Sequence, residues 1–327
     1  MTFQRLQSLE QWPDALHGGV VAIGNFDGVH RGHQAVLANA LDDRGDAPAI
    51  VLTFEPHPRQ FFQPETVLPR ITPAPMKADI LKRMGFDAVV ELAFAESFSK
   101  LSAEDFVKNI LVDGLHAATV VTGFDFHFGA KRQGGPAYLI EAGARHGFDV
   151  RLVDAFRDEE AEVISSSRIR AALADGDLSH ANALLGYRYR VASPITGGKQ
   201  LGRTLGYPTA NMALPEEAPL AHGIYAVRFH RADGSVHNGV ASFGRRPTVD
   251  EDGAPLLETF VFDFDDDLYG EDCVVSLVAY LRGEEKFNGL DALKEQMDRD
   301  AHLARSVLAQ LSPLSGLDAA MTFGHGG

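Results

Sequence analysis

Short apolar runs alternate with helix-like segments over the first half of the chain. The apolar runs occupy residues 20–23, 49–54, 88–92, 118–122 and 150–153. Runs that are apolar at nearly every position are typical of strands buried on both faces of a parallel sheet. The segments that separate them, at residues 34–42, 74–84, 102–112 and 137–146, have helical spacing. This alternation predicts an α/β fold with a doubly wound parallel sheet, covered by helices on both faces.

The pattern changes near residue 185. Two helix-like segments, 167–174 and 178–185, are followed by closely spaced strand-like runs at residues 189–195, 225–229, 236–242, 259–264 and 274–281. Turns that contain Gly or Pro separate these runs, which favours a small antiparallel β-barrel or sandwich. An amphipathic helix is expected over residues 290–311, because Leu, Met and Val recur there at helical spacing.

The fold class is therefore α/β plus β, in two domains. The first domain is expected to span residues 1–184 and the second residues 185–311. The remaining residues, 312–327, are rich in Gly and Ala and are expected to form a disordered tail.

Composition is that of an ordinary globular protein, with 45% hydrophobic and 23% charged residues in 327. No apolar run approaches the ~18 residues that span a bilayer, so no membrane helix is expected. The N-terminus lacks the basic-then-apolar pattern of a secretory signal, which predicts a cytoplasmic protein. The single cysteine, Cys273, has no partner for an internal disulfide and is expected in the core.

The net charge of −15 argues against a broad basic surface for nucleic acid. Small phosphorylated ligands are compatible with this charge. They bind to backbone N–H groups, helix N-termini and Mg²⁺, none of which needs a positive overall field.

The stretch GNFDGVHRGH, residues 24–33, joins the first apolar run to the first helix-like segment. Its glycines allow the backbone to approach a phosphate closely, and Gly32 leaves room for a nucleotide. His30 and His33 are three residues apart at the helix start, so both imidazoles can donate hydrogen bonds to phosphate oxygens. Two alternatives stay open: a Gly-rich turn with solvated histidines, and a metal site in which Asp27 joins both histidines.

Further motifs narrow this chemistry to a family. HRGH matches the HxGH signature of nucleotidyltransferases, and it is followed in order by TFEPHPRQFF (53–62), ITP (71–73), TGFDFHFGAKRQG (122–134) and ISSSRIR (164–170). This set resembles the N-terminal module of prokaryotic bifunctional riboflavin kinase/FMN adenylyltransferase, also called FAD synthetase. The resemblance implies a Rossmann-like nucleotidyltransferase domain that transfers AMP from ATP to FMN, with FAD and pyrophosphate as products.

The resemblance also implies site residues for this domain. Its catalytic residues would be His30, His33 and Arg168. Its ATP- and flavin-binding residues would be Gly24, Asn25, Phe26, Asp27, Gly32, Asp125, Arg132, Ser165, Ser166 and Ser167. The serines would cap a helix whose N–H groups, with Arg168, hold the ATP phosphates. Alternatively, the segment is only a helix cap with an exposed arginine.

One residue of this first module differs from the family pattern, and the role of three aromatic residues stays open. His127 stands where many relatives have Arg. The aromatic side chains of Phe124, Phe126 and Phe128 fit a flavin site and a strand end in the core equally well.

The second half resembles the riboflavin kinase module through GGKQLGRTLGYPTAN, residues 197–211. The glycine loop with Lys199 would surround the ATP phosphates, although it is not the GxxxxGK[ST] loop. Thr209 and Asn211 would be oxygen ligands of Mg²⁺, on one face of an extended segment. The implied ATP- and flavin-binding residues are Gly198, Lys199, Arg203, Gly206, Pro208, Arg282 and Phe287.

Glu258 occupies the position of the family's catalytic glutamate, at a predicted strand start. A carboxylate there would accept the proton of the ribityl 5′-hydroxyl. The acids at positions 263 and 265–267 are interpreted as a solvated turn instead. Ser193-Pro194 replaces a common Gly-Arg pair, which predicts an altered strand edge before the glycine loop.

Both modules together predict a bifunctional enzyme that converts riboflavin to FMN and FMN to FAD. Its cofactor would be Mg²⁺, with ATP as co-substrate; its partners would be riboflavin, FMN, FAD and ATP, without nucleic acid, membrane or an obligate protein partner. The alternatives are an enzyme with one degenerate module and a flavin-binding protein without turnover.

Overall fold

The computed structural model describes residues 2–42, 44–197, 207–245 and 255–324. Contacts divide the chain into two compact units. The first comprises residues 1–68 and 72–165, and the second comprises residues 69–71 and 166–327. Among the described residues, no helix is long and apolar enough to cross a membrane.

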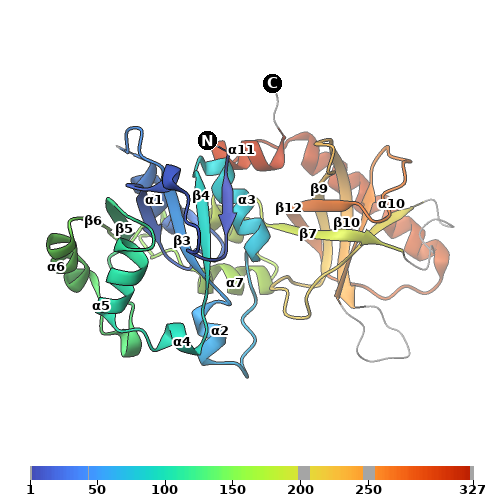
Figure 1. Cartoon of the computed structure of the whole chain (residues 1–327). Coiled ribbons are helices and arrows are strands. Elements are labelled where there is room, and N and C mark those ends of the chain that lie inside the picture. Colours follow the sequence, from blue (N-terminus) through green and yellow to red (C-terminus); the bar gives the residue numbers. More distant parts are fainter. Residues whose placement is uncertain (1, 43, 198–206, 246–254, 325–327) are drawn as a thin grey trace. The chain divides into compact units, whose positions relative to one another are not determined.

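The first unit is built on a parallel sheet of six strands in the order β1-β4-β3-β2-β5-β6 (Figure 1). The strands are β1 (Gln4–Leu6), β2 (Val20–Ile23), β3 (Ala49–Glu55), β4 (Ala88–Ala93), β5 (Thr119–Gly123) and β6 (Asp149–Val153). Every pairing in it is parallel, which confirms the predicted fold class. The chain continues from β2 to β3 on one side, and β5 pairs with β2 on the other. The strand order therefore reverses at β2, and ligands of such sheets bind beside the carboxyl end of that strand.

Helices follow the strands as the periodicity predicts. They are η1 (Asp14–Leu16), α1 (Arg31–Leu41), α2 (Pro58–Phe62), α3 (Ala74–Met84), α4 (Glu96–Ser99), α5 (Ala103–Asp105), η2 (Phe106–Val112), η3 (Ala130–Arg132) and α6 (Pro136–His146). The predicted helix at 102–112 is capped by Ser102, whose side chain accepts a hydrogen bond from the Asp105 N–H. It then changes to a π-helical segment at Phe106, a wider turn that periodicity alone does not distinguish.

The second unit contains a closed barrel in the order β10-β11-β8-β7-β12-β9 (Figure 1). Its strands are β7 (Arg190–Thr196), β8 (Thr209–Ala213), β9 (Gly223–His230), β10 (Val236–Arg245), β11 (Pro255–Val261) and β12 (Asp272–Arg282). All of their pairings are antiparallel, so the barrel alternative is confirmed. Strand β8 escaped prediction because its sequence, TANMA, lacks an apolar run.

Helices α7 (Ser166–Ala174) and α8 (Leu178–Leu185) belong to the same unit as the barrel. Asn182 of α8 is buried and binds two backbone groups of the barrel region. Its Nδ2 donates to the Leu277 carbonyl over 3.2 Å, and its Oδ1 accepts from the Tyr189 N–H over 2.8 Å. Helix α8 contacts β12 of the barrel, and α7 contacts α8. The domain boundary expected after residue 184 stays a prediction.

The long helix is α10 (Leu290–Ala309), and it packs on the barrel through Ala304, Val307 and Leu308. The spacing predicts the contacts of Val307 and Leu308, but it is wrong for Leu290 and Leu303, which are exposed. Ala304 and Leu308 lie in one apolar cluster with Ala226 and Phe262.

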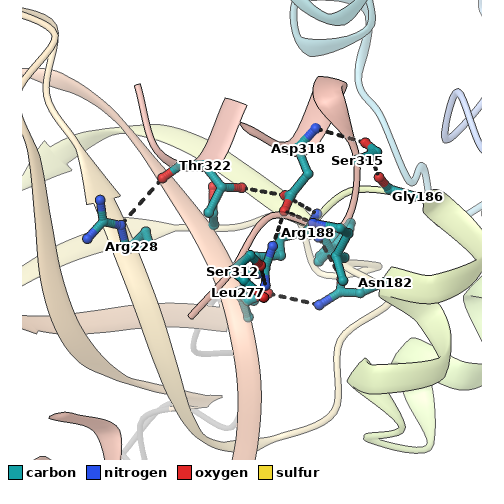
Figure 2. A network of polar contacts seen from close by, with 12 residues as sticks. Asn182, Gly186, Arg188, Arg228, Leu277, Ser312, Ser315, Asp318 and Thr322 are labelled. Carbon is teal, nitrogen blue, oxygen red and sulfur yellow. Dashed lines mark hydrogen bonds and ion pairs between the residues drawn. The ribbon is translucent and has the colours of Figure 1, made fainter. Parts of the chain in front are cut away.

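The predicted disordered tail is wrong for the described residues up to 324, because α11 (Gly316–Thr322) docks there. Asp318 is fully buried and forms an ion pair with Arg188 (Figure 2). The carboxylate also accepts hydrogen bonds from the Thr322 hydroxyl over 2.7 Å and the Leu314 N–H over 2.9 Å. Ser315 caps α11 and donates to the Gly186 carbonyl over 2.8 Å. Composition predicts disorder here, but one buried carboxylate with a partner 130 residues earlier orders the segment.

Candidate active sites

The loop between β2 and α1 lies at the switch point of the parallel sheet and has a tightly bent backbone. Phe26, Gly28 and Val29 all have positive φ, at 50°, 89° and 36°. A Cβ added at Gly24 would lie 2.8 Å from the Phe26 ring, so this position requires glycine. Phe26 itself is buried, and its ring lies edge-on to the His33 ring; its predicted ligand contact stays a prediction.

Thr72 fixes this loop through both of its polar groups. Its backbone N–H donates to Asp27 Oδ1 over 3.1 Å, and its hydroxyl accepts from the Gly28 N–H over 2.7 Å. Asp27 is 2% exposed, so its carboxylate is committed to this internal contact. Thr72 belongs to the ITP motif, so this motif holds the β2–α1 loop.

His30 is the N-cap of α1, one position before the helix begins. Its Nδ1 accepts a hydrogen bond from the His33 N–H over 3.2 Å, and the side chain is buried. Because Nδ1 is the acceptor, the hydrogen of the neutral ring lies on Nε2. The cap therefore determines which nitrogen donates.

The His33 ring stacks on the His30 ring, with centroids 3.6 Å apart and planes 18° apart. Burial lowers the pKa of His33 well below 6.5, and the nearby groups His30, Lys77 and His57 lower it further. Nδ1 of His33 is buried and has no hydrogen-bond partner in the described part of the chain. Gly32 makes this stack possible, since a Cβ there would lie 3.2 Å from the His30 ring. The two rings are thus brought together as the motif predicts.

Asp125 and Arg132 follow the carboxyl end of β5. The Asp125 carbonyl contacts His127 Nδ1 at 2.7 Å, and the same nitrogen lies 3.1 Å from Arg132 Nη2. His127 thus connects both predicted binding residues. The three phenylalanines of this segment divide between the alternatives: Phe128 is buried in the core and Phe126 packs against it, whereas Phe124 is 49% exposed.

The serine segment lies at the start of α7, which begins at Ser166. Ser166, Ser167 and Arg168 belong to the second unit, and Ser165 is the last residue of the first. Arg168 Nη2 lies 3.5 Å from His180 Nε2 of α8. Its predicted phosphate contact stays a prediction.

In the barrel, Glu258 of β11 lies directly opposite Asn211 of β8 and directly opposite Ser242 of β10. Residues in direct opposition on antiparallel strands have their side chains on the same face. Thr209 is two residues before Asn211 on β8 and shares that face. The neighbours of these residues face the other way, into the core: Leu257, before Glu258, and Met212, after Asn211, are fully buried. Register thus gathers a carboxylate, an amide and two hydroxyls on one face.

This donor set fits Mg²⁺, which prefers carboxylate, carbonyl and hydroxyl oxygens. Asn211 Nδ2 donates to the Thr209 carbonyl over 3.3 Å, a contact that directs the amide group along the strand.

Clusters of three or more His, Cys, Asp or Glu that could bind a metal do not occur in the described ranges. The metal alternative for Asp27 and the two histidines is therefore not supported.

Arg282 ends β12 and is held by a buried carboxylate of α10. Its Nε and Nη2 donate to Asp300 over 2.9 and 2.6 Å, and the hydrogen bonds raise the pKa of Arg282. The guanidinium lies 5.8 Å from the Phe287 ring centroid.

Pro208 is exposed just before β8. The other predicted binding residues of the glycine loop, Gly198, Lys199, Arg203 and Gly206, lie outside the described residues.

The predicted alteration at Ser193-Pro194 does not interrupt β7. Pro194 pairs with Asp272 of β12, while pairing with β8 begins only at Ile195. The missing N–H of proline therefore falls where β7 has a partner strand on one side only.

The acidic segment after β11 is a turn, as predicted. The side chain of Asp263 is exposed and forms an ion pair with Arg305, and that of Asp266 is exposed and pairs with Arg231.

Comparisons with known proteins cover both halves. Residues 13–168 match the family described as FAD synthetase, and residues 185–308 match riboflavin kinase. The chain is 42% identical over 296 residues to the bifunctional riboflavin kinase/FMN adenylyltransferase of Pseudomonas fluorescens, covering 90% of this chain and 94% of that one. It is 38% identical over 305 residues to the protein of the same name from Haemophilus influenzae, covering 93% and 98%. A solved Streptococcus pneumoniae structure, described as a macrolide-efflux protein, has a TM-score of 0.80 at 30% identity and covers 95% of this chain and 100% of its own.

Proposed function

The chain belongs to the family of bifunctional riboflavin kinase/FMN adenylyltransferases, and on that premise we propose that it makes FAD from riboflavin in two steps. The barrel phosphorylates riboflavin with ATP to FMN. The parallel-sheet unit then transfers AMP from a second ATP to FMN and releases pyrophosphate. One observation carries the proposal: the chain holds two separate sets of polar groups suited to phosphate chemistry, the stacked His30–His33 pair and the Glu258–Asn211 cross-strand pair.

The adenylyl transfer needs charge stabilisation rather than proton removal. An oxygen of the FMN phosphate, already ionised, bonds to the α-phosphorus of ATP, and the bond to the bridging oxygen of pyrophosphate breaks. Nε2–H of His30, oriented by the N-cap contact, donates to the charge that develops on the phosphate oxygens. His33 acts beside it as a neutral ring, and the N-terminus of α1 adds its dipole.

The kinase step does need a base. Glu258 accepts the proton of the ribityl 5′-hydroxyl while that oxygen bonds to the γ-phosphorus and the bond to ADP breaks. Thr209 and Asn211 would hold Mg²⁺ on the same strand face. When bound, the ion would neutralise negative charge on the phosphate groups. Arg282, fixed by Asp300, lies beside Phe287 and is proposed to border the flavin ring.

The substrates define the partners: riboflavin, FMN, FAD and ATP. Glu258 and the histidine pair are both in place, so neither module has lost its proposed central residues. This favours two activities over an enzyme with one degenerate module and over a flavin-binding protein without turnover. A reducing cytoplasm suits the lone thiol of Cys273, which is buried in β12.

A time course of riboflavin with ATP and MgCl₂, followed by chromatography, tests both activities together. We expect riboflavin to decline, FMN to rise and then fall, and FAD to accumulate. A reaction that stops at FMN would contradict adenylyl transfer. Conversion of added FMN to FAD, with riboflavin left unchanged, would contradict the kinase activity.

A further inference from the structure

Lys77 is a fully buried lysine, with 0% of its side chain exposed. It lies on the inner face of α3, one turn before the buried Ile80 and Leu81. A lysine in the row of apolar residues of an amphipathic helix is the signal by which the sequence alone could have singled it out. Lysine is rarely fully buried unless its charge is paired.

The ammonium group has three hydrogens, and the structure gives an acceptor for each. Lys77 Nζ donates to Glu55 Oε1 over 2.9 Å, to Thr53 Oγ1 over 3.0 Å and to the Asn25 carbonyl over 3.2 Å. Thr53 Oγ1 also donates to the Asn25 carbonyl over 3.2 Å. These contacts join the helix to the end of β3 and to the β2–α1 loop.

The position of these acceptors matters for the site. Asn25 is the second residue of GNFDGVHRGH, and Thr53 and Glu55 end β3, the strand beside β2 at the switch point. Thr72 holds the same loop further along, at Asp27 and Gly28. The Lys77 contacts fix the start of the loop, so the loop is held at two separate points before His30.

We propose that Lys77 is a positioning residue of the AMP-transfer site, holding the loop before the histidine pair and adding a buried positive charge next to it. The inference rests on the adenylyltransferase activity proposed for this unit. An apolar side chain would fill the same space without the free-energy cost of a buried charge. The cation is of use where a triphosphate and a second phosphate bring negative charge together.

The charge of Lys77 acts on His33. The groups that face this ring are His30 from its own helix start, Lys77 from α3 and His57 at the N-cap of α2. The Phe26 ring lies edge-on to it, with the two centroids 5.4 Å apart. Burial is the main reason why the pKa of His33 is low, and the cation contributes after His30. Removal of the cation therefore raises the pKa of His33 toward 6.5.

The test compares Lys77→Met with Lys82→Met, a matched variant of an exposed lysine on the same helix. In the full-length protein, we expect Lys77→Met to lower kcat for FAD formation about 10²-fold, because a misplaced loop misaligns the reacting groups. KM for FMN and ATP should change less than about 3-fold, and riboflavin phosphorylation should stay within about 2-fold, as in Lys82→Met. NMR titration of ¹³C-labelled histidine should show that the His33 pKa is higher in Lys77→Met than in the wild type. In Lys82→Met, the His33 pKa should be unchanged.

Thr53→Val is the second variant, because it removes the hydroxyl that accepts from Lys77 and donates to the Asn25 carbonyl, keeps the cation and is nearly isosteric. We expect kcat for FAD formation to fall about 3- to 10-fold with the His33 pKa unchanged. If Lys77→Met does not fold, this variant alone decides. Full kcat in the folded variants, or an equal loss in Lys82→Met, would overturn the proposal for Lys77. Absence of FAD formation by the wild-type protein would instead overturn the proposed activity itself.

Discussion

The two candidate sites, both proposed to act on phosphate groups, are built from opposite structural elements. In the parallel-sheet unit, the chemistry lies in a bent loop and a helix start, where Thr72 and the N-cap contact of His30 hold the backbone. In the barrel, it lies on the face of paired strands, where register alone places Glu258 opposite Asn211. Adenylyl transfer starts from an ionised phosphate and needs donors only, whereas phosphorylation of a hydroxyl needs a base. On the proposed roles, the two sites differ in the demand for proton removal, although both use ATP.

The largest effect is expected from loss of the base in the barrel. Glu258→Gln should lower riboflavin phosphorylation about 10³-fold, since a general base contributes about 10²–10⁴. FAD formation from added FMN should stay within about 2-fold, because the parallel-sheet site uses no carboxylate base. Separate assays with riboflavin and with FMN measure both rates. Asp265→Asn, in the exposed turn after β11, is the control and should leave both rates unchanged.

The docked C-terminal helix should matter for stability of the barrel unit alone. Asp318→Asn leaves Arg188 buried without its counter-charge, and the free energy of unfolding should fall by about 3 kcal/mol. Denaturant titration of the full-length protein measures it, with exposed Asp291→Asn as control. A wild-type unfolding curve for Asp318→Asn would show that α11 contributes nothing to the barrel.

His30→Ala is the reciprocal of the Glu258 change. It removes both the oriented Nε2–H donor and the cap of α1, so FAD formation should fall about 10²-fold. Riboflavin phosphorylation should be retained, as in the control His302→Ala, an exposed histidine of α10. Equal loss of both activities would contradict independent sites.

The smallest effect is a pH dependence confined to the parallel-sheet unit. His33 has a folded-state pKa below 6.5, so the unfolded chain takes up a proton there that the folded chain excludes. The contribution of His33 to stability should therefore be fully present well above pH 6.5 and be lost on acidification below it, by up to about 1.4 kcal/mol per pH unit. Denaturation of the wild type and His33→Gln at pH 7.5 and 5.5 measures this. The two proteins should differ in slope, and identical slopes would exclude His33 as the source.

The sequence predicted buried strands well and polar ones poorly. Runs such as 49–54 and 88–92 are apolar throughout, and burial on both faces of a sheet leaves no other place for them. Strands β1 and β8 have no such run. They form because each pairs with a partner strand, which an apolar pattern in the sequence cannot reveal. The ladder to β11 is what turns the PTAN motif into a strand with Thr209 and Asn211 on one face.

The candidate sites divide in the same way. Motifs named the histidines, Glu258, Thr209 and Asn211, because residue type and spacing carry that chemistry. They did not reveal Thr72 or Lys77, whose contacts to the loop span 44 and 52 positions of the chain. Nor did they reveal that Phe26 is buried or that His127 connects Asp125 with Arg132.

By itself, the sequence determined two modules, the order of most strands and helices, and the residue types that handle phosphate. Apolar periodicity and local motifs express these features over a few neighbouring residues. Only the tertiary structure decided which nitrogen of His30 donates, which face carries Glu258, and that the last helix docks through Asp318. The first depends on the backbone geometry of the helix start, where the His33 N–H meets His30 Nδ1. The other two depend on strand pairing and on a buried ion pair, whose partners lie far along the chain and leave no local signal.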